Sequence, residues 1–338
     1  MKVLLLLGDH SGCGFYRMKE PARVINALNL GVEVEVVDYI DIETNQFGTP
    51  LEVFVEADIV VFQRPMTDSL LTCMKIIQKK GIKVVVELDD DIAALMPGHA
   101  GYHHVAPHLS PESNWKNLKT ACLMADWMTV STPALTKYRP DGRVSVIRNR
   151  VPRSLTELPY KGEYEIGWTG TLETHPDDLW DVHNKLTDYQ FHMVGDSTGL
   201  QKALSLKTPP TETGWLDIED YYKALTTLKV GIAPLKTSTF NTGKSYLKVL
   251  EYSAVSVPFV ASGSPEYRYF VENYGGLLAT KSKEWSSRVA KLVNNPDFAR
   301  EMGEDLRQQV IKHHLMEDGG LEWVSAWQHA LGRVKVQS

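Results

Sequence analysis

Residues 230–262 read VGIAPLKTSTFNTGKSYLKVLEYSAVSVPFVAS, and this stretch carries the strongest signal of architecture in the chain. Two short apolar runs, at 230–233 and 257–261, predict strands at either end. Between them, apolar residues recur at helical spacing over 247–255 and predict a helix. Strand, loop, helix and strand in this order are the repeating unit of a parallel sheet covered by helices.

The loop in this stretch brings Gly243, Lys244 and Ser245 to the start of the predicted helix. A helix N-terminus has unpaired N–H groups and partial positive charge, so it favours a phosphate. Lys244 and Lys248 lie one turn apart and add cationic groups, and Glu251 on the next turn is suited to accept hydrogen bonds from two ribose hydroxyls. These residue types in this order predict a nucleotide-sugar site.

Two simpler explanations compete with that prediction. The residues GKS could end a phosphate-binding P-loop, but that motif needs glycine where this chain has Ser238. The lysines could instead belong to the solvated face of a surface helix, which is where most lysines lie.

The stretch as a whole resembles the donor-binding segment of GT-B glycosyltransferases, closest to the family-four-like retaining enzymes of the group 1 type. In those enzymes the pattern "apolar strand, PL, F-N, K-S, L-K, LEY-A, PFVAS" recurs in nearly this order. The resemblance implies a donor site, with Lys244 also catalytic, made of Asn241, Thr242, Gly243, Lys244, Lys248 and Glu251. Relatives often carry Glu-x7-Glu here. Glu251 matches the second glutamate, but the first falls on Gly243, so its sugar contact is lost or supplied by backbone N–H groups near 241–243.

Length and composition predict two globular domains. The chain has 338 residues, is 43% hydrophobic and 23% charged, and has a net charge of −6. Neither half is basic, so bulk electrostatics give a nucleic-acid partner no help. The apolar run Val3 to Leu7 is too short for a membrane span and lacks a basic n-region, so it predicts a strand. Cys13, Cys73 and Cys122 lack metal-ligand spacing and predict reduced thiols in a cytoplasmic protein.

The first half of the chain alternates strand and helix patterns, which predicts a parallel, doubly wound, Rossmann-like sheet. The predicted strands are 3–7, 33–37, 59–62, 84–88, 127–130 and 144–147. The predicted helices are 17–28, 69–80, 114–125 and 133–138. Ligands of such sheets bind at the carboxyl ends of strands, so the loops there hold the candidate site residues.

The loop after the first strand is GDHSGCGFY, residues 8–16, followed by Arg17. Its two glycines, Gly12 and Gly14, permit close approach of a ligand to the backbone or form a tight turn. The dinucleotide fingerprint G-x-G-x-x-G fails because Arg17 stands where it needs a glycine. The loop is similar to a Gly-rich loop of some GT-B enzymes, which implies that Gly14 and Arg17 contact donor phosphates or acceptor.

Three consecutive carboxylates, Asp89, Asp90 and Asp91, follow the fourth predicted strand. They could cap a helix, bind a divalent metal, act as a base for an acceptor hydroxyl or bind sugar hydroxyls. Four histidines follow within ten residues, at 99, 103, 104 and 108.

The carboxylates resemble the "DiDD" segment of GT-B relatives. This implies Asp90 and Asp91 as catalytic residues, Asp89, His103 and His104 as acceptor contacts, and no metal.

The second half opens with a predicted strand at 165–168 followed by Gly170 and Thr171. The loop is similar to the family's "G-x-x-G-[ST]-x-x-x-H-x-x-D-L", which implies that Gly170 and Thr171 face the diphosphate. Many relatives place arginine and lysine here, and their absence shifts the cationic role to Lys244 and Lys248. His175 is explained as well by capping or packing.

Residues 213–225 match the family pattern "x-G-W-x-x-x-x-x-Y-Y-x-x-L". The resemblance implies that Trp215 and Leu216 lie against the nucleobase, although aromatic residues at such positions are commonly part of the core. Residues 125–152 resemble the family's ending of the N-terminal domain. Trp323 and Trp327, one turn apart, give the last helix an apolar face that would pack on that domain.

The predicted fold class is therefore α/β of GT-B type, with two Rossmann-like doubly wound domains facing a cleft and a C-terminal helix crossing back. The expected domains are 1–153 for the acceptor, completed by a helix at about 319–338, and 160–315 for the nucleotide sugar.

The expected function is transfer of a sugar from a UDP- or GDP-sugar to an acceptor hydroxyl, with retention, without a required cofactor or metal, and without membrane insertion. The acceptor is a small molecule, a protein or a modified DNA base, and some compact relatives are encoded by phages. Three alternatives remain: a metal-dependent hydrolase built on Asp89 to Asp91 and the histidines, a non-catalytic nucleotide-sugar-binding protein, and a GT-B-like epimerase.

Overall fold

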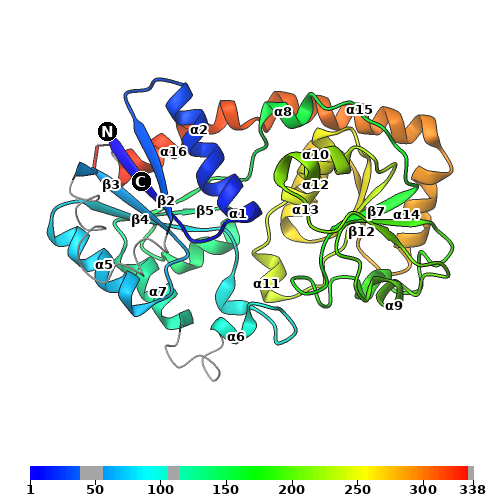
Figure 1. The fold of residues 1–338 in the computed structure, drawn as a ribbon, viewed down its shortest axis with the longest axis horizontal. Helices are drawn as coiled ribbons and strands as arrows, with labels where there is room; N and C mark the ends of the chain where they lie inside the picture. The colour runs from blue at the N-terminus through cyan, green and yellow to red at the C-terminus, as the bar shows by residue number, and fades with distance from the viewer. Residues whose placement is uncertain (39–55, 106–113, 334–338) are drawn as a thin grey trace. The chain divides into compact units, whose positions relative to one another are not determined.

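The computed structural model describes residues 1–38, 56–105 and 114–333 and divides the chain into two compact units (Figure 1). The first unit contains residues 1–95, 102–149 and 316–338, and the second contains residues 96–101 and 150–315. His108 and the last five residues of the predicted C-terminal helix lie outside the described residues. Among the described helices, none is long and apolar enough to cross a membrane.

The first unit is built on a six-stranded sheet in which every pairing is parallel. Its strands are β1 (Lys2–Leu7), β2 (Glu33–Asp38), β3 (Ile59–Gln63), β4 (Lys83–Leu88), β5 (Trp127–Val130) and β6 (Val144–Val146). The strand order is β2-β1-β3-β4-β5-β6. The order therefore reverses between β1 and β3, which is the topological switch point where doubly wound sheets bind ligands.

Helices cover both faces of this sheet because its strands are apolar on both sides. They are α1 (Gly12–Gly14), a π-helical turn (Phe15–Lys19), α2 (Glu20–Ala27), α5 (Asp68–Lys79), a 3-10 turn (Ile92–Ala94), α6 (Tyr102–Val105), α7 (Asn114–Met124), a 3-10 turn (Pro133–Tyr138) and α16 (Met316–Ala330). The helix predicted at 133–138 is thus a 3-10 turn, and the first predicted helix opens with a π-helical turn.

Helix α16 packs in the first unit, beside α2, as the predicted return of the last helix requires (Figure 1). Trp323 and Trp327 are buried in one core cluster with Val3 and Leu5 of β1. The guanidinium of Arg17 lies 4.6 Å above the ring of Trp323. The apolar face of α16 therefore completes the core of a sheet that begins at the other end of the chain.

The second unit repeats the plan with another parallel six-stranded sheet. Its strands are β7 (Ile166–Gly170), β8 (Phe191–Gly195), β9 (Thr211–Glu212), β10 (Gly231–Ala233), β11 (Phe259–Ser262) and β12 (Leu277–Ala279). The order is β12-β11-β10-β7-β8-β9, so the switch point lies between β7 and β10. The predicted α/β class with two doubly wound sheets is confirmed.

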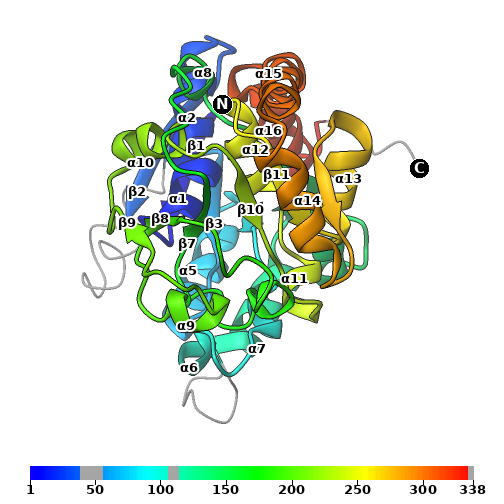
Figure 2. The same cartoon turned by 90° about the vertical axis from the view of Figure 1, so that its right-hand side faces the viewer.

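The helices of the second unit include a long one before the return to the first unit. They are α8 (Arg153–Thr156), a 3-10 turn (Trp180–Val182), α9 (Leu200–Leu204), α10 (Ile218–Leu225), α11 (Thr239–Thr242), α12 (Leu247–Ala254), α13 (Pro265–Tyr274), α14 (Glu284–Val293) and α15 (Pro296–His313). Helices α13 and α14 flank the sheet next to β11 (Figure 2).

The stretch 230–262 differs from its prediction in one respect. The loop before the main helix contains the short helix α11, whose cap Ser238 accepts a hydrogen bond of 3.0 Å from Asn241 N–H. Helix α12 begins at Leu247, and Tyr246 directly before it is buried, with its ring 5.3 Å from that of Phe270. Lys244 therefore precedes α12 by three residues, and its placement at the helix start was wrong.

Candidate functional site

The candidate site of the second unit lies at the carboxyl ends of β7 and β10, on either side of the switch point. Strand β7 ends at Gly170, whose φ of +131° favours glycine, and Thr171 follows it. The loop after β10 continues through α11 to α12. The fold thus brings together two loops that are some 60 residues apart in sequence.

Asp178 joins these two loops. Its Oδ1 accepts hydrogen bonds from Lys236 N–H (3.0 Å) and from the side-chain amide of Asn241 (2.6 Å). Its Oδ2 lies 2.7 Å from Nδ1 of His175. Burial opposes ionisation, but these hydrogen bonds, led by that with His175, hold the pKa of Asp178 below its usual range. Asp178 is therefore an anion that fixes the positions of both loops.

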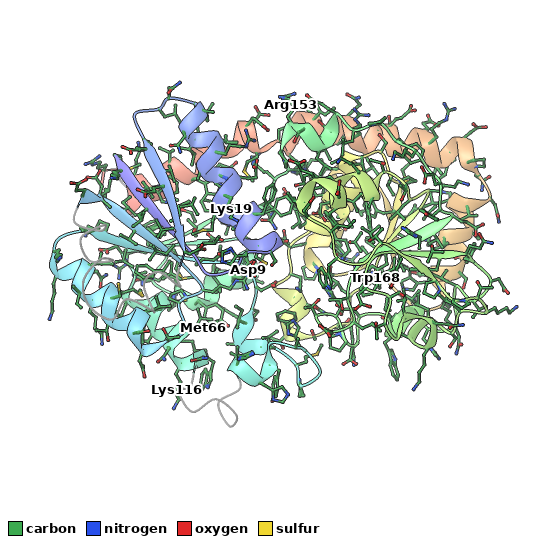
Figure 3. All side chains as sticks on the ribbon, viewed as in Figure 1. Asp9, Lys19, Met66, Lys116, Arg153 and Trp168 are labelled. Carbon is green, nitrogen blue, oxygen red and sulfur yellow. The ribbon has the colours of Figure 1, made fainter. Side chains whose placement is uncertain are left out.

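Lys248, on the first turn of α12, reaches back to β7. Its Nζ donates to the backbone carbonyl and, at 3.1 Å, to the hydroxyl of Thr169, and it lies 5.5 Å above the ring of Trp168. Trp168 is 1% exposed and is labelled in Figure 3. Burial lowers the pKa of Lys248 to about 8, opposed by the nearby Glu251 and reinforced by Lys244. Nearby negative charge thus offsets only part of the cost of burying this ammonium group, and a bound anion would stabilise its charged form.

Glu251 is buried one turn beyond Lys248 and accepts a hydrogen bond of 2.8 Å from the hydroxyl of Tyr221. Tyr221 lies on α10, whose first turn is capped by Asp217 through a hydrogen bond of 2.9 Å from Asp220 N–H. The carboxylate of Glu251 is therefore oriented by a side chain from a separate helix.

Lys244 is half-buried in the segment between α11 and α12, with its Nζ 4.7 Å above the ring of Phe240. The ring of His99 lies 5.4 Å from the same phenyl ring. His99 belongs to residues 96–101, which pack in the second unit, where Ala100 N–H donates to the carbonyl of Glu173 at 2.8 Å. Lys244 and Phe240 thus lie beside residues 96–101, which come from the first half of the sequence but pack in the second unit.

Four more of the residues predicted for the donor occupy the same unit. Trp215 and Leu216 lie between β9 and α10, and the Trp215 side chain is 73% exposed. Thr242 is exposed at the end of α11, where its hydroxyl donates to Ser238 O at 2.9 Å. Gly243 directly follows that helix.

Gly14 and Arg17, also predicted for the donor, belong to the first unit. A Cβ on Gly14 would lie 1.8 Å from the carbonyl oxygen of Asp9, so this glycine is required by the chain itself. The Arg17 side chain is 2% exposed, and its Nε lies 2.6 Å from Glu87. Its Nη1 donates to Asn149 Oδ1 at 3.0 Å. The contacts of Arg17 within the first unit are those of an interior ion pair.

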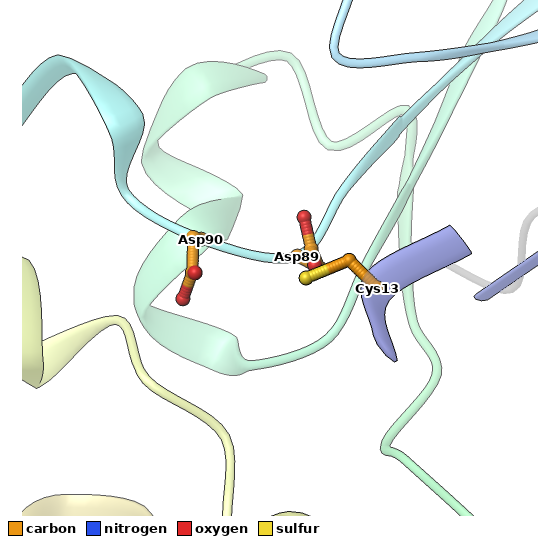
Figure 4. Close-up of side chains that lie close together, drawn as sticks. All are labelled: Cys13, Asp89 and Asp90. Carbon is orange, nitrogen blue, oxygen red and sulfur yellow. The ribbon is translucent and has the colours of Figure 1, made fainter. Parts of the chain in front are cut away.

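Asp89 and Asp90 lie near the switch point of the first sheet, together with Cys13 (Figure 4). One ligand atom from each of these three residues lies within 4.8 Å of the others. Asp89 also pairs at 2.8 Å with Nε of Arg64, a residue with φ of +50° directly after β3. Because a guanidinium already neutralises Asp89, this group is poorly suited to a divalent cation.

The other residues predicted for the acceptor lie apart from that group. Asp91 is 2% exposed, and its carboxylate accepts from the hydroxyl of Tyr138 and pairs with Lys137. His103 and His104 are exposed on α6, and neither belongs to the metal-compatible group found among the described residues. The carboxylate-and-histidine cluster that a metal-dependent hydrolase would need is therefore not assembled from these residues.

Three residues with central contacts were missed or undervalued from the sequence: Asp178, Tyr221 and His175. The spacing His-x-x-Asp at 175–178 was a usable signal, because it places a carboxylate within reach of an imidazole. The contacts of Asp178 with Asn241 and of Tyr221 with Glu251 span 63 and 30 residues, and no local pattern indicates them.

Residues 179–319 match a family model described as glycosyl transferase-like. No curated protein sequence matches the chain. Among solved structures, sucrose-phosphate synthase from Thermosynechococcus elongatus is similar with a TM-score of 0.69 at 14% identity, covering 99% of this chain and 100% of that one.

Two further solved structures are similar to this chain. HepE from Anabaena in complex with UDP-glucose is similar with a TM-score of 0.66 at 14% identity, covering 96% of this chain and 100% of that one. A putative UDP-N-acetylglucosamine 2-epimerase from Listeria monocytogenes is similar with a TM-score of 0.54 at 12% identity, covering 99% of this chain and 97% of that one. These likenesses extend over the whole chain and show that its fold is GT-B.

Proposed function

We propose that this protein is a glycosyltransferase that moves a sugar from a nucleoside-diphosphate sugar to an acceptor hydroxyl. The observation that carries the proposal is the convergence of Lys248, Glu251 and Gly170 at the β7/β10 switch point of a GT-B fold. The match of residues 179–319 to a glycosyl transferase-like model and the likeness to a UDP-glucose complex support it.

In this proposal the second unit holds the donor. The diphosphate lies against Gly170 and Thr171 and is neutralised by Lys244 and Lys248, and the ribose hydroxyls donate to the Glu251 carboxylate. Asn241, Thr242 and Gly243 line the loop beside the sugar, and Trp215 and Leu216 lie against the base, which is uracil or guanine.

The chemical step needs stabilisation of the leaving nucleoside diphosphate. Negative charge grows on that group as the bond to the sugar breaks, and fixed cations there stabilise the transition state more than the ground state. Lys244 and Lys248 supply this charge without a required metal. Retention at the anomeric carbon is inferred from the resemblance of 230–262 to retaining enzymes.

The first unit is proposed to bind the acceptor through Asp89, His103 and His104, with Asp90 as a catalytic residue. Asp91 is already held by Tyr138 and Lys137, so we now assign it to shaping this loop. The acceptor is a small molecule, a protein or a modified DNA base, and we infer a cytoplasmic enzyme, of phage origin by resemblance.

An epimerase is the second candidate, because the putative 2-epimerase from Listeria monocytogenes shares the fold over nearly its whole length. The two activities differ in their products. An epimerase converts its nucleotide sugar in the absence of any acceptor, whereas a glycosyltransferase releases a nucleoside diphosphate.

A panel of UDP- and GDP-sugars tests the proposal in two steps. The first is the melting temperature with each compound, since a ligand at 100 times its dissociation constant adds about 2.7 kcal/mol of stability. The second is analysis of the products formed from the stabilising compounds, with and without acceptors. Stabilisation by ATP that equals that by every diphosphate sugar would contradict the proposal.

A further inference from the structure

Three side chains surround the place above Gly170 where any other residue would carry its Cβ. Cδ2 of His175 lies 3.4 Å from that point, Nζ of Lys248 lies 3.5 Å from it, and Cζ2 of Trp168 lies 3.6 Å from it. The His175 side chain is 14% exposed, so solvent or a ligand reaches it from one side. The absence of a side chain on Gly170 therefore leaves a small space lined by an imidazole and an ammonium group.

The imidazole is held in one orientation. Nδ1 of His175 lies 2.7 Å from Asp178, whose carboxylate also accepts from Lys236 N–H and Asn241. Because an ionised carboxylate accepts hydrogen bonds, Nδ1 of His175 carries the proton, and Nε2 is the other ring nitrogen, bonded to the Cδ2 atom that lies nearest the Gly170 position. Nε2 has no hydrogen-bond partner among the described residues.

Two buried polar atoms next to this dyad also lack partners in the described structure. Both hydrogen bonds of the Asn241 amide nitrogen go to acceptors, Asp178 and Lys236 O, which fixes the orientation of the amide. Its Oδ1 is then left without a donor, although Asn241 is 3% exposed. Trp168 Nε1 is likewise buried without an acceptor. Unpaired buried polar atoms are costly, and they indicate a place where a polar ligand or ordered water binds.

We propose that His175 is a further ligand-contacting residue of this site, which takes up a proton when a nucleoside diphosphate binds and donates a hydrogen bond from Nε2 to it. Asp178 is the positioning residue that holds the ring. The inference rests on the proposed function and adds a third cation to Lys244 and Lys248, formed when the diphosphate arrives.

The surroundings of His175 explain why its imidazole is neutral before the diphosphate binds. The charged groups around the ring are Asp178 on its own loop, Lys244 from the segment before α12, and Lys248 on the first turn of α12. Burial and the two ammonium groups keep the pKa of His175 well below its usual range, against the opposing effect of Asp178. A bound diphosphate would neutralise both lysines, and the imidazole would then accept a proton from solvent.

The experiment measures proton uptake during UDP binding, with GDP as the second probe. Isothermal titration at pH 7 in two buffers of different ionisation enthalpy gives the number of protons exchanged per UDP bound. We expect net uptake by the wild type and less by His175→Gln, which should bind UDP about tenfold more weakly. Protons that UDP or Lys248 exchanges are counted in both proteins. They cancel when the proton uptake of His175→Gln is subtracted from that of the wild type.

The controls separate a charged contact from a merely structural one. Uridine lacks the phosphates and should cause no uptake in the wild type. His183→Gln changes an exposed histidine of the same unit and should match the wild type. Asp178→Asn provides a second variant, in which the neutral amide no longer favours the imidazolium, so proton uptake should again fall.

Two results would overturn the inference. Equal proton uptake and equal UDP affinity in the wild type and His175→Gln would show that this imidazole does not meet the diphosphate, while leaving the proposed function intact. Binding of neither UDP nor GDP to the wild type would remove the proposed function itself, and this inference with it.

Discussion

The hydroxyl of Tyr221 donates a hydrogen bond of 2.8 Å to the carboxylate of Glu251, and the two residues lie on different helices, α10 and α12. The contact fixes the direction of a buried acid beside Lys248. In the proposed donor site this acid receives the ribose hydroxyls. Tyr221 then orients the recognition of the ribose without being one of its ligands.

Tyr221→Phe should raise the KM for the donor several-fold and leave kcat nearly unchanged, and Glu251→Ala should do the same more strongly. Ribose contacts change little between ground and transition state, so their loss weakens binding more than turnover. Steady-state kinetics with varied donor measures both constants. A fall in kcat at constant KM would show that Glu251 acts in the chemical step.

Lys244→Ala should lower kcat by about 10²–10³-fold, because one fixed charge at the leaving group is lost. Lys244 precedes α12, so the variant should melt as the wild type does. Lys207→Ala, which changes an exposed lysine paired with Asp188, is the matched control and should keep full activity. Wild-type turnover by Lys244→Ala would place the diphosphate elsewhere.

Removal of divalent cations with EDTA should leave activity in place. Cys13, Asp89 and Asp90 are the metal-compatible group among the described residues, and Arg64 already pairs with Asp89. Activity measured before and after chelation, and again after dialysis, checks this. Loss of activity that Mn²⁺ or Mg²⁺ restores would make the cluster a metal site.

Gly14→Ala should destabilise the protein by at least about 2 kcal/mol, because the new methyl group would overlap the carbonyl oxygen of Asp9. Gly12→Ala is the matched control, since a Cβ there meets no atom within 4 Å. Thermal unfolding of both variants makes the comparison. Equal melting temperatures would mean that the loop after β1 moves freely to admit a side chain.

The contribution of Asp126 to stability should depend on pH. Burial opposes its ionisation, but hydrogen bonds from Lys83, Val84 N–H and Gln78 hold its pKa below the usual value. A lowered folded-state pKa gives stability above the unfolded value of about 3.9, and this stability is lost as the pH falls through the folded value. Asp126→Asn should therefore cost about 1–2 kcal/mol at pH 7 and less at pH 3.

Urea unfolding of the wild type and Asp126→Asn at both pH values measures this difference. Asp188→Asn, at an exposed carboxylate, should follow the wild type throughout. A penalty for Asp126→Asn that grows in acid would reverse the assigned sign.

Periodicity was enough to predict the strands and the class of the sheets, because buried parallel strands are short apolar runs between loops. Lys244 was placed at the start of α12, but the helix begins after Tyr246, which is buried against Phe270 of a separate helix, and no local pattern indicates that contact. Asp178 was missed for the same physical reason: its partners Lys236 and Asn241 come from the loop after another strand.

The buried ion pair of Arg17 with Glu87 also could not be predicted from the sequence. A loop arginine before a helix is a common phosphate ligand, and its pairing with Glu87 depends on β4, 70 residues away. The roles that the sequence suggests for Lys244, Asp89, Asp90, His103 and His104 stay predictions.

The position of α16 in the first unit affects how the protein is made. Trp323 and Trp327 fill the same core cluster as β1, yet the ribosome synthesises them after the whole of the second unit. All the strands of the second unit are synthesised before α16, so this unit is free to fold first. One apolar face of the first sheet stays partly uncovered until α16 has been synthesised. We therefore expect the N-terminal unit to be the last to become stable during synthesis, with its uncovered apolar face prone to aggregation until then.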